Sequence, residues 1–125
     1  MCRIAGIISS GKTSDEKYNT VKSMCDYLQH GGPDDAGIFV SEDGTICLGH
    51  RRLSIIDLSS AGHQPMRSNQ LLLTFNGEIY NFHELRSELK LKGSIFRTGT
   101  DTEVILKAFV KWGTRSFERL RGMFS

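Results

Sequence analysis

The sequence predicts a single layered α+β domain, residues 1–125, in which antiparallel strands alternate with helices. Two observations carry this prediction. Apolar runs flank an Asp-Gly pair, which is typical of a tight hairpin. Three segments with helical periodicity each open with polar residues suited to capping. The chain contains no repeat, low-complexity tract or linker that would divide it.

The first half of the chain is predicted to form a strand, a helix and a hairpin. Residues 3–9 are an apolar run and are expected to be a buried strand. Residues 13–16 have capping-box spacing and open a helix that the breaking sequence 31–33 should end. The apolar face of this helix would consist of Tyr18, Val21, Cys25 and Leu28. Residues 38–40 and 46–48 then flank the Asp-Gly turn of the hairpin.

The second half is predicted to form two more strands and two helices. The strands are the apolar runs 53–56 and 71–75. The helices open at 81–84 and 100–103, where polar residues precede a helical period. The first of these helices is expected to end near Gly93 and to bury Leu85 and Leu89. The second is expected to end at Gly113 and to bury Val104, Ala108 and Trp112. The apolar segment 120–125 looks like the start of a strand, so we expect a fragment of a longer protein, because natural ends are usually polar.

Composition argues for an ordinary globular domain in the cytoplasm. The chain is 38% hydrophobic and 24% charged with a net charge of +2, and its cations are scattered, so neither nucleic acid nor a membrane is an expected partner. Three cysteines without a CxxC pair favour a reducing compartment. Cys25 and Cys47 lie in apolar patterns and are expected in the core. The four histidines have no ligand spacing, so no metal site is predicted.

Cys2 is the strongest candidate for a catalytic residue. If Met1 is removed, Cys2 carries both a thiol and a free α-amine, and such amines titrate at roughly pH 7.7–8. One residue can then act as nucleophile and general base together. Taken alone, Cys2 also fits a small apolar residue at the start of a buried strand.

Five polar or glycine-rich segments follow Cys2 at predicted strand ends and helix starts: 31–35, 49–57, 64–66, 75–81 and 99–104. In this order they resemble the class II, N-terminal-nucleophile glutamine amidotransferase domain of asparagine synthetases. The sequence Phe75-Asn76-Gly77-Glu78-Ile79-Tyr80-Asn81 resembles the synthetases more than the sugar-phosphate and purine-pathway amidotransferases. The resemblance spans the whole chain. It implies a four-layer αββα sandwich, incomplete at its C-terminal end because the family's domain continues further.

The resemblance assigns catalytic roles to three residues. Cys2 would attack the carboxamide of glutamine, and its own amine would take the thiol proton and return it to the leaving ammonia. The side-chain amide of Asn76 and the backbone N–H of Gly77 would form the oxyanion hole, where each donor is typically worth about 3–4 kcal/mol. Without the resemblance, Asn76-Gly77 also fits a type I′ turn.

The same resemblance assigns glutamine binding to a second group. Arg52 would bind the α-carboxylate, because a planar guanidinium suits that group. Asp101 and Glu78 would hold the α-ammonium, although Asp101 also fits a helix first-turn acid. The segment that runs beside the pocket in the family supplies Leu53, Ile55 and Ile56. Arg51 occupies a variable position and is expected to be a solvated surface charge.

Two residues depart from the family pattern. Arg3 stands where the family usually has glycine, and Gly31 stands where it usually has arginine. A long cation at position 3 would lie near the mouth of the site, and loss of the arginine at position 31 would loosen the loops around it.

The resemblance also implies what this chain lacks. The family's ATP-dependent synthetase domain, with its Ser-Gly-Gly-x-Asp signature, is absent, as is a P-loop. No cofactor is therefore expected here, and ATP and Mg²⁺ would belong to the synthetase domain. The expected partners are L-glutamine and a synthetase domain or subunit that receives ammonia for an aspartate-type carboxylate. The sequence does not show the oligomeric state, although the exposed strand edges of a truncated sandwich would allow self-association into a homo-oligomer.

Two other functions remain open at this stage. Arg3, Gly31 and the abrupt end favour a non-catalytic amidotransferase module that serves as an interaction or structural domain. An amidohydrolase that acts on another amide is the third candidate, but Arg52 and Asp101 together favour a free α-amino acid.

Overall fold

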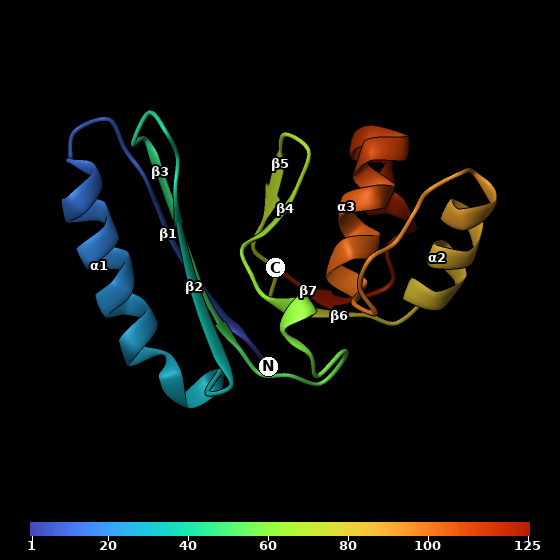
Figure 1. The fold of residues 1–125 in the computed structure, drawn as a ribbon, viewed down its shortest axis with the longest axis horizontal. Coiled ribbons are helices and arrows are strands. Elements are labelled where there is room, and N and C mark those ends of the chain that lie inside the picture. Colours follow the sequence, from blue (N-terminus) through green and yellow to red (C-terminus); the bar gives the residue numbers. More distant parts are fainter.

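The computed structural model describes residues 1–125 as successive layers of helices and strands (Figure 1). Helix α1 (Ser14–Tyr27) covers one face of a three-stranded sheet, and α2 (Phe82–Leu91) and α3 (Asp101–Trp112) form the opposite outer layer. Two short strand pairs lie between that sheet and these two helices (Figure 1). The αββα order predicted from the sequence is confirmed.

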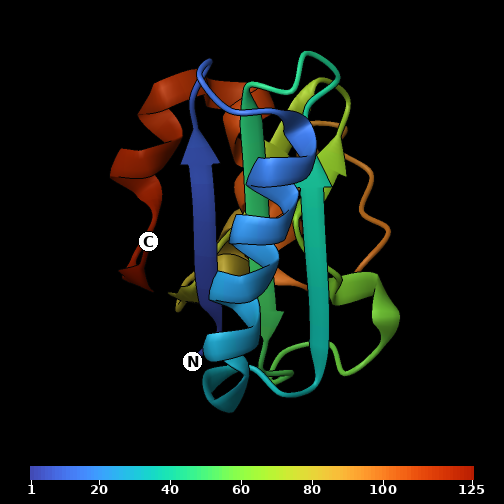
Figure 2. The same cartoon turned by 90° about the vertical axis from the view of Figure 1, so that its left-hand side faces the viewer.

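The three-stranded sheet consists of β1 (Arg3–Ile8), β2 (Asp35–Val40) and β3 (Ile46–Arg52). Its spatial order is β1-β3-β2, and both pairings are antiparallel. The predicted hairpin is confirmed as β2 and β3, and α1 runs along the face of all three strands (Figure 2).

Local sequence signals explain where α1 begins and what it buries. Thr13 Oγ1 accepts from the Glu16 backbone N–H over 3.2 Å, and the Thr13 backbone N–H donates to Glu16 Oε2 over 2.8 Å, which completes the predicted capping box. On the buried side of α1, Val21 and Cys25 pack against Cys47 of β3. Tyr18 is 43% exposed, so its predicted inward position is wrong. The buried residues of α1 are Lys17, Val21 and Cys25, a stripe at four-residue intervals that does not include position 18.

The second strand layer is divided into two pairs. In one, β4 (Met66–Ser68) pairs with β5 (Leu71–Leu73), and in the other, β6 (Gly77–Ile79) pairs with β7 (Gly122–Phe124). The predicted strand at 71–75 is therefore shorter than expected. The strand predicted near the end of the chain is confirmed as β7, whereas β4 and β6 were not predicted.

The main core lies between this layer and the two outer helices. Its buried residues are Phe75, Ile79, Leu85, Leu89, Val104, Ile105 and Ala108. The apolar faces predicted for α2 and α3 are thus confirmed. Thr100 caps α3 by accepting from the Glu103 backbone N–H over 3.1 Å. No helix of the chain combines the length and the apolar character needed to span a bilayer. Short 3₁₀ helices cover 29–31, 60–62 and 113–119.

The predicted strand at 53–56 is wrong, because β3 ends at Arg52 and the chain continues as an irregular loop. Polar groups from elsewhere in the fold satisfy the backbone of this loop. The Leu53 N–H donates to Cys2 Sγ over 3.3 Å, and the Ser54 N–H donates to Asp34 Oδ2 over 2.7 Å. A segment whose amides bond to side chains has no need of a neighbouring strand.

Two burial predictions also fail. Arg51 is only 8% exposed, because it lies on the central strand β3 and its Nε donates to the Gly32 carbonyl over 3.0 Å. It is not a solvated surface charge. Strand β1 was expected to be buried, yet Ile8 is 78% exposed. β1 is an edge strand, and α1 covers only one of its faces.

Candidate active site

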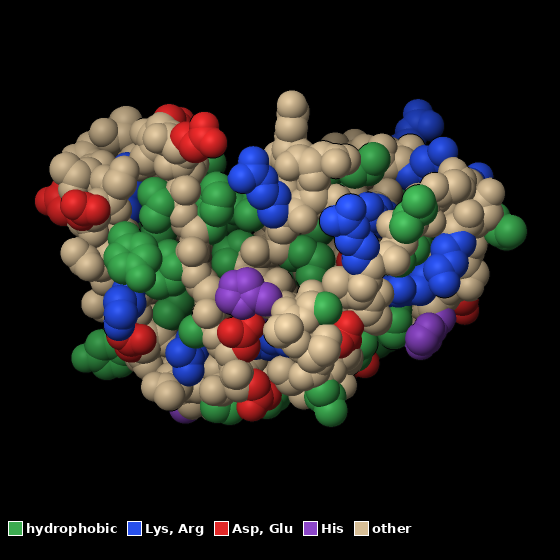
Figure 3. Space-filling view, in the orientation of Figure 1, with side chains coloured by type: hydrophobic (Ala, Val, Ile, Leu, Met, Phe, Trp, Pro, Cys, Tyr) green, Lys and Arg blue, Asp and Glu red, His purple; other side chains and the backbone are tan.

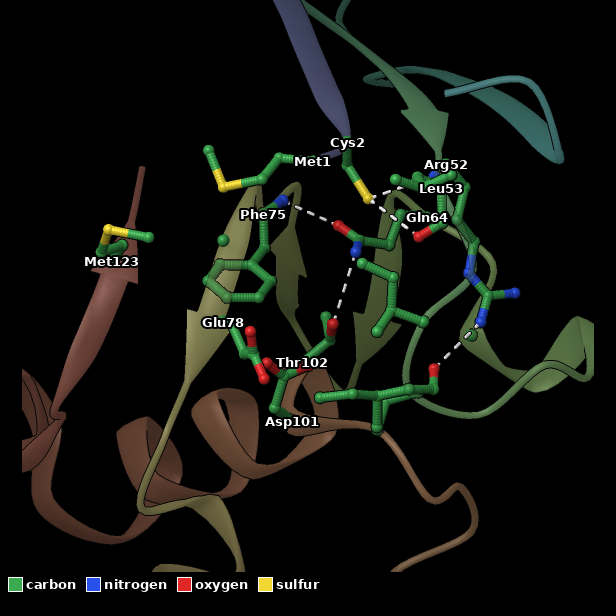
Figure 4. A pocket seen from close by; sticks show the side chains of 15 residues that line it. Met1, Cys2, Arg52, Leu53, Gln64, Phe75, Glu78, Asp101, Thr102 and Met123 are labelled. Carbon is green, nitrogen blue, oxygen red and sulfur yellow. Dashed lines mark hydrogen bonds between the residues drawn. The ribbon is translucent and has the colours of Figure 1, made fainter. Parts of the chain in front are cut away.

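A cavity of about 170 Å³ opens where the N-terminus, the end of β3, strand β6 and the start of α3 converge (Figure 4). Eight of the nine site residues predicted from the sequence line it: Cys2, Arg52, Leu53, Ile55, Ile56, Gly77, Glu78 and Asp101. Asn76, the ninth, adjoins it through Gly77. The structure therefore gathers the predicted residues from four separate segments around one space.

Antiparallel pairing places the Cys2 thiol beside the end of β3. Arg3 lies opposite Arg51 in the β1–β3 register, so Cys2 lies opposite Arg52 and just beyond the paired region. The Cys2 thiol donates to the Leu53 carbonyl over 3.6 Å and accepts from the Leu53 N–H over 3.3 Å. Met1 lies next to Cys2 at the cavity wall (Figure 4). The sulfur is thus held at a defined position in a partly open site.

Strand pairing also orients the backbone of Gly77. Asn76 and Ser125 exchange two backbone hydrogen bonds of 2.9 Å, so Gly77 and Phe124 form the next, non-hydrogen-bonded pair of the antiparallel ladder. The N–H of Gly77 consequently faces away from β7. A side chain here would collide with the Met123 carbonyl and would lie 2.5 Å from Phe124 Cα. The chain passes through Asn76-Gly77 as extended backbone, so the type I′ turn is excluded.

Two buried side chains hold the backbone of Phe75 by hydrogen bonds to its carbonyl and its N–H. His50 is fully buried, and its Nε2 donates to the Phe75 carbonyl over 3.1 Å. Gln64 is also buried, and its Oε1 accepts from the Phe75 N–H over 2.7 Å. Burial lowers the pKa of His50 to about 4, so the imidazole is neutral at physiological pH. Both side chains fix the residue that precedes Asn76, whose Oδ1 is buried without a partner.

The guanidinium of Arg52 holds the irregular loop in place. Its Nη1 donates to the Ser59 carbonyl over 2.7 Å, and its Nη2 donates to the carbonyls of Ile56 and Asp57. Arginine has five N–H donors, so the Nε–H and one N–H of Nη1 remain without a protein partner. Gly62 packs so closely against Nη2 that a side chain there would collide with it. Arg52 therefore shapes the cavity wall and still has donors for an anion.

Two carboxylates lie across the cavity from Cys2 (Figure 4). Asp101 is 5% exposed in the first turn of α3, and its Oδ2 accepts from the Ile79 N–H over 3.1 Å. Burial raises the pKa of Asp101, and the nearby Glu78 charge raises it further. Two neighbouring acids, one of them buried, make this end of the cavity suitable for a cationic group.

Sequence reasoning missed several lining residues. Gln64 bonds through its Nε2 to Thr102 Oγ1 over 3.3 Å, which links the loop before β4 to α3. The polar sequence 64–66 was the available signal, but sequence alone assigned it no role. The other unassigned lining residues are Met1, Gly62, Phe75, Thr100, Thr102 and Met123.

No group of three or more His, Cys, Asp and Glu side chains is placed to hold a metal ion. The other two cysteines, Cys25 and Cys47, are buried, and burial raises the pKa of both thiols. Cys2 is the one cysteine that lines the cavity.

The chain is similar to several known proteins. It is 39% identical to a putative glutamine-hydrolysing asparagine synthetase of Methanocaldococcus jannaschii and 39% identical to asparagine synthetase 1 of Bacillus subtilis. Asparagine synthetase 1 of Arabidopsis thaliana is 38% identical. Each alignment covers 100% of this chain but only 27%, 20% and 21% of the respective relative.

A solved structure shares the fold. The glutamine phosphoribosylpyrophosphate amidotransferase of Bacillus subtilis superimposes with a TM-score of 0.78 over 99% of this chain and 34% of its own, at 23% sequence identity. The sequence profile of the glutamine amidotransferase domain matches residues 1–125, that is, the whole chain. This protein therefore belongs to the glutamine amidotransferase domain family.

Proposed function

We propose that residues 1–125 hydrolyse L-glutamine to glutamate and ammonia through a thioester on Cys2. One observation supports this above all: the Cys2 thiol, Gly77 and the buried Asp101 carboxylate line the same cavity of about 170 Å³. Nucleophile, oxyanion donor and ammonium-binding acid are the parts that this reaction needs. The family membership of the chain agrees with the assignment.

The cavity suits the two ends of an amino acid. The α-carboxylate of glutamine would accept from the unpaired N–H groups of Arg52, and its α-ammonium would bind between Asp101 and Glu78. The carboxamide would then extend toward Cys2, which lies across the cavity from these acids (Figure 4). Binding both charged ends places the amide carbon beside the sulfur, which lowers the entropy loss of the attack.

The chemistry follows from removal of Met1. The amine of Cys2 takes the thiol proton, and Sγ attacks the carboxamide carbon to form a tetrahedral oxyanion. The Gly77 N–H and the Asn76 side-chain amide would donate to this oxyanion. The C–N bond then breaks, and the ammonium form of the amine returns the proton to the departing ammonia. Water attacks the thioester by the same steps, which releases glutamate and restores the thiol.

We further propose that the ammonia serves a synthetase domain or subunit that amidates an aspartate-type carboxylate. The relatives that support this are named as glutamine-hydrolysing asparagine synthetases, and this chain spans about a fifth to a quarter of their length. ATP and Mg²⁺ would act in that other part of the machinery, and the cytoplasm would be the site of the reaction.

Intact mass spectrometry with the glutamine-like electrophile diazo-oxo-norleucine tests the proposal. We expect loss of Met1 followed by one adduct on Cys2, and then ammonia release from glutamine in a coupled assay. Cys2→Ala should abolish both signals, whereas Cys25→Ala should keep the adduct because Cys25 is buried away from the cavity. A processed chain that neither labels nor releases ammonia would instead support a non-catalytic module.

A further inference from the structure

The two residues that depart from the family pattern are in contact. The side chain of Arg3 lies directly over Gly31: a Cβ placed on Gly31 would be 2.7 Å from both Arg3 Cζ and Arg3 Nε. Gly31 is not among the glycines with positive φ, so backbone conformation does not require glycine there. A side chain at position 31 would instead have to displace the end of the Arg3 side chain.

The guanidinium of Arg3 is directed at the N-terminus. Its Nη1 donates to the Met1 carbonyl over 2.8 Å and to the Cys2 carbonyl over 3.0 Å. None of the four salt bridges of the chain includes Arg3. The side chain is therefore held by backbone carbonyls around the nucleophile and not by an acid elsewhere on the surface.

The β1–β3 ladder explains why Cys2 needs such a partner. Ser9 donates to Thr45 over 2.9 Å, and this bond identifies the odd-numbered residues of β1 as the hydrogen-bonded positions. Cys2 is an even-numbered position, so its N–H and carbonyl face away from β3. The strand cannot hold this carbonyl, and Arg3 supplies the hydrogen bond instead.

We infer that Arg3 is a positioning residue for Cys2, with its guanidinium seated over Gly31. After Met1 is removed, the bond to the Cys2 carbonyl remains and ties down the residue that carries both the thiol and the amine. Two side-chain contacts then fix Cys2: the sulfur on Leu53 and the carbonyl on Arg3. Misplacing a catalytic group by about 1 Å can lower the rate roughly a hundredfold. Loss of the hydrogen bond from Arg3 to the Cys2 carbonyl is therefore expected to lower turnover strongly. This inference rests on the proposed glutaminase function.

A double-mutant cycle tests the inference in the processed protein, with Met1 removal checked by intact mass. We expect Arg3→Met to lower kcat for glutamine hydrolysis by about tenfold to a hundredfold with little change in KM, because the substrate contacts remain. Arg3→Lys keeps one donor and should recover part of the loss. Arg115→Met, a change at an exposed arginine outside the cavity, is the matched control.

Gly31→Ala supplies the second arm of the cycle. It should lower kcat when Arg3 is present, because the new methyl group displaces the guanidinium, and it should have no further effect in the Arg3→Met background. Equal effects of Gly31→Ala in both backgrounds, or unchanged kcat in Arg3→Met, would overturn the inference. If the unmodified chain itself neither labels nor releases ammonia, the proposed function fails, and that result is distinct from either outcome.

Discussion

The backbone N–H of Ile79 donates to Asp101 Oδ2 over 3.1 Å, and this bond joins the free edge of β6 to the first turn of α3. Ile79 lies opposite Gly122 in a non-hydrogen-bonded pair, as Gly77 lies opposite Phe124. The N–H groups of Gly77 and Ile79 therefore face the same edge. The Ile79 N–H bonds to the buried acid, which leaves the Gly77 N–H free for the oxyanion of the proposed reaction.

Replacing Asp101 should separate stability from binding. Burial raises the pKa of Asp101, so the folded protein binds a proton more tightly than the unfolded chain. The stabilisation that this carboxyl contributes is fully present below the pKa that it has in the unfolded chain. It is lost as the pH rises through the raised pKa of the folded protein. Asp101→Asn keeps the acceptor for Ile79 and removes this pH dependence. We expect the free energy of unfolding of Asp101→Asn to exceed that of the wild type at pH values above the raised pKa of Asp101. Urea titrations at intervals of about one pH unit, beginning near pH 3, measure this difference.

The same variant should bind glutamine more weakly. In a Cys2→Ala background, calorimetry should show a Kd raised by about tenfold or more, because the charge that faces the α-ammonium is gone. Asp15→Asn, which changes an exposed first-turn acid of α1, is the matched control and should leave the Kd unchanged. Equal affinity in Asp101→Asn would remove this residue from the binding site.

Arg52→Met should loosen the loop and weaken glutamine binding together. The guanidinium donates to three carbonyls between Ile56 and Ser59, and hydrogen bonds from charged groups contribute about 1.5–3 kcal/mol each. We expect the free energy of unfolding to fall by about 2–4 kcal/mol and limited proteolysis to cut the loop. Arg52→Lys should retain charge but not the fork geometry, and so should recover little. Arg67→Met, at an exposed position, provides the comparison.

How far the sequence predicts this structure depends on where each residue finds its partners. The capping box at Thr13 was predictable because its two hydrogen bonds connect residues three apart. The loop at 53–56 was not, because Cys2 and Asp34, from distant parts of the chain, accept hydrogen bonds from its first two amides. An apolar run alone cannot distinguish a strand from such a loop.

The same distinction between local and distant partners applies to the residues of the candidate site. The positions of Cys2 and Asp101 could be predicted because motif residues carry them, and the fold brings both to one cavity. The burial of Arg51 and the contact of Arg3 with Gly31 depend on how segments far apart in sequence approach each other. Tertiary contacts of this kind leave no periodic signal.

Gly77→Ala should abolish turnover by displacing the Gly77 N–H from its position at the cavity. The added methyl group would collide with the Met123 carbonyl, so β6 and β7 must separate or shift. Overpacking of this type costs about 1–3 kcal/mol, which urea titration would detect. Gly11→Ala is the matched control, because its nearest neighbour would be Ser9 Oγ at 3.8 Å. Full glutaminase activity in Gly77→Ala would exclude the Gly77 N–H as an oxyanion donor.

Acid should destabilise the fold through His50. Its pKa is lowered from 6.5 to about 4 by burial, so below pH 6.5 the unfolded chain takes up a proton that the folded protein refuses. The stabilisation that the neutral imidazole contributes is fully present above the pKa of histidine in the unfolded chain. As the pH falls toward the lowered pKa of the folded protein, the free energy of unfolding decreases by about 3 kcal/mol at most. His50→Gln keeps a donor for the Phe75 carbonyl and should flatten the decline measured by urea titration between those two pKa values. His30→Gln, at an exposed histidine, should leave the decline as steep as in the wild type. A His50→Gln profile parallel to that of the wild type would show that the acid sensitivity arises elsewhere.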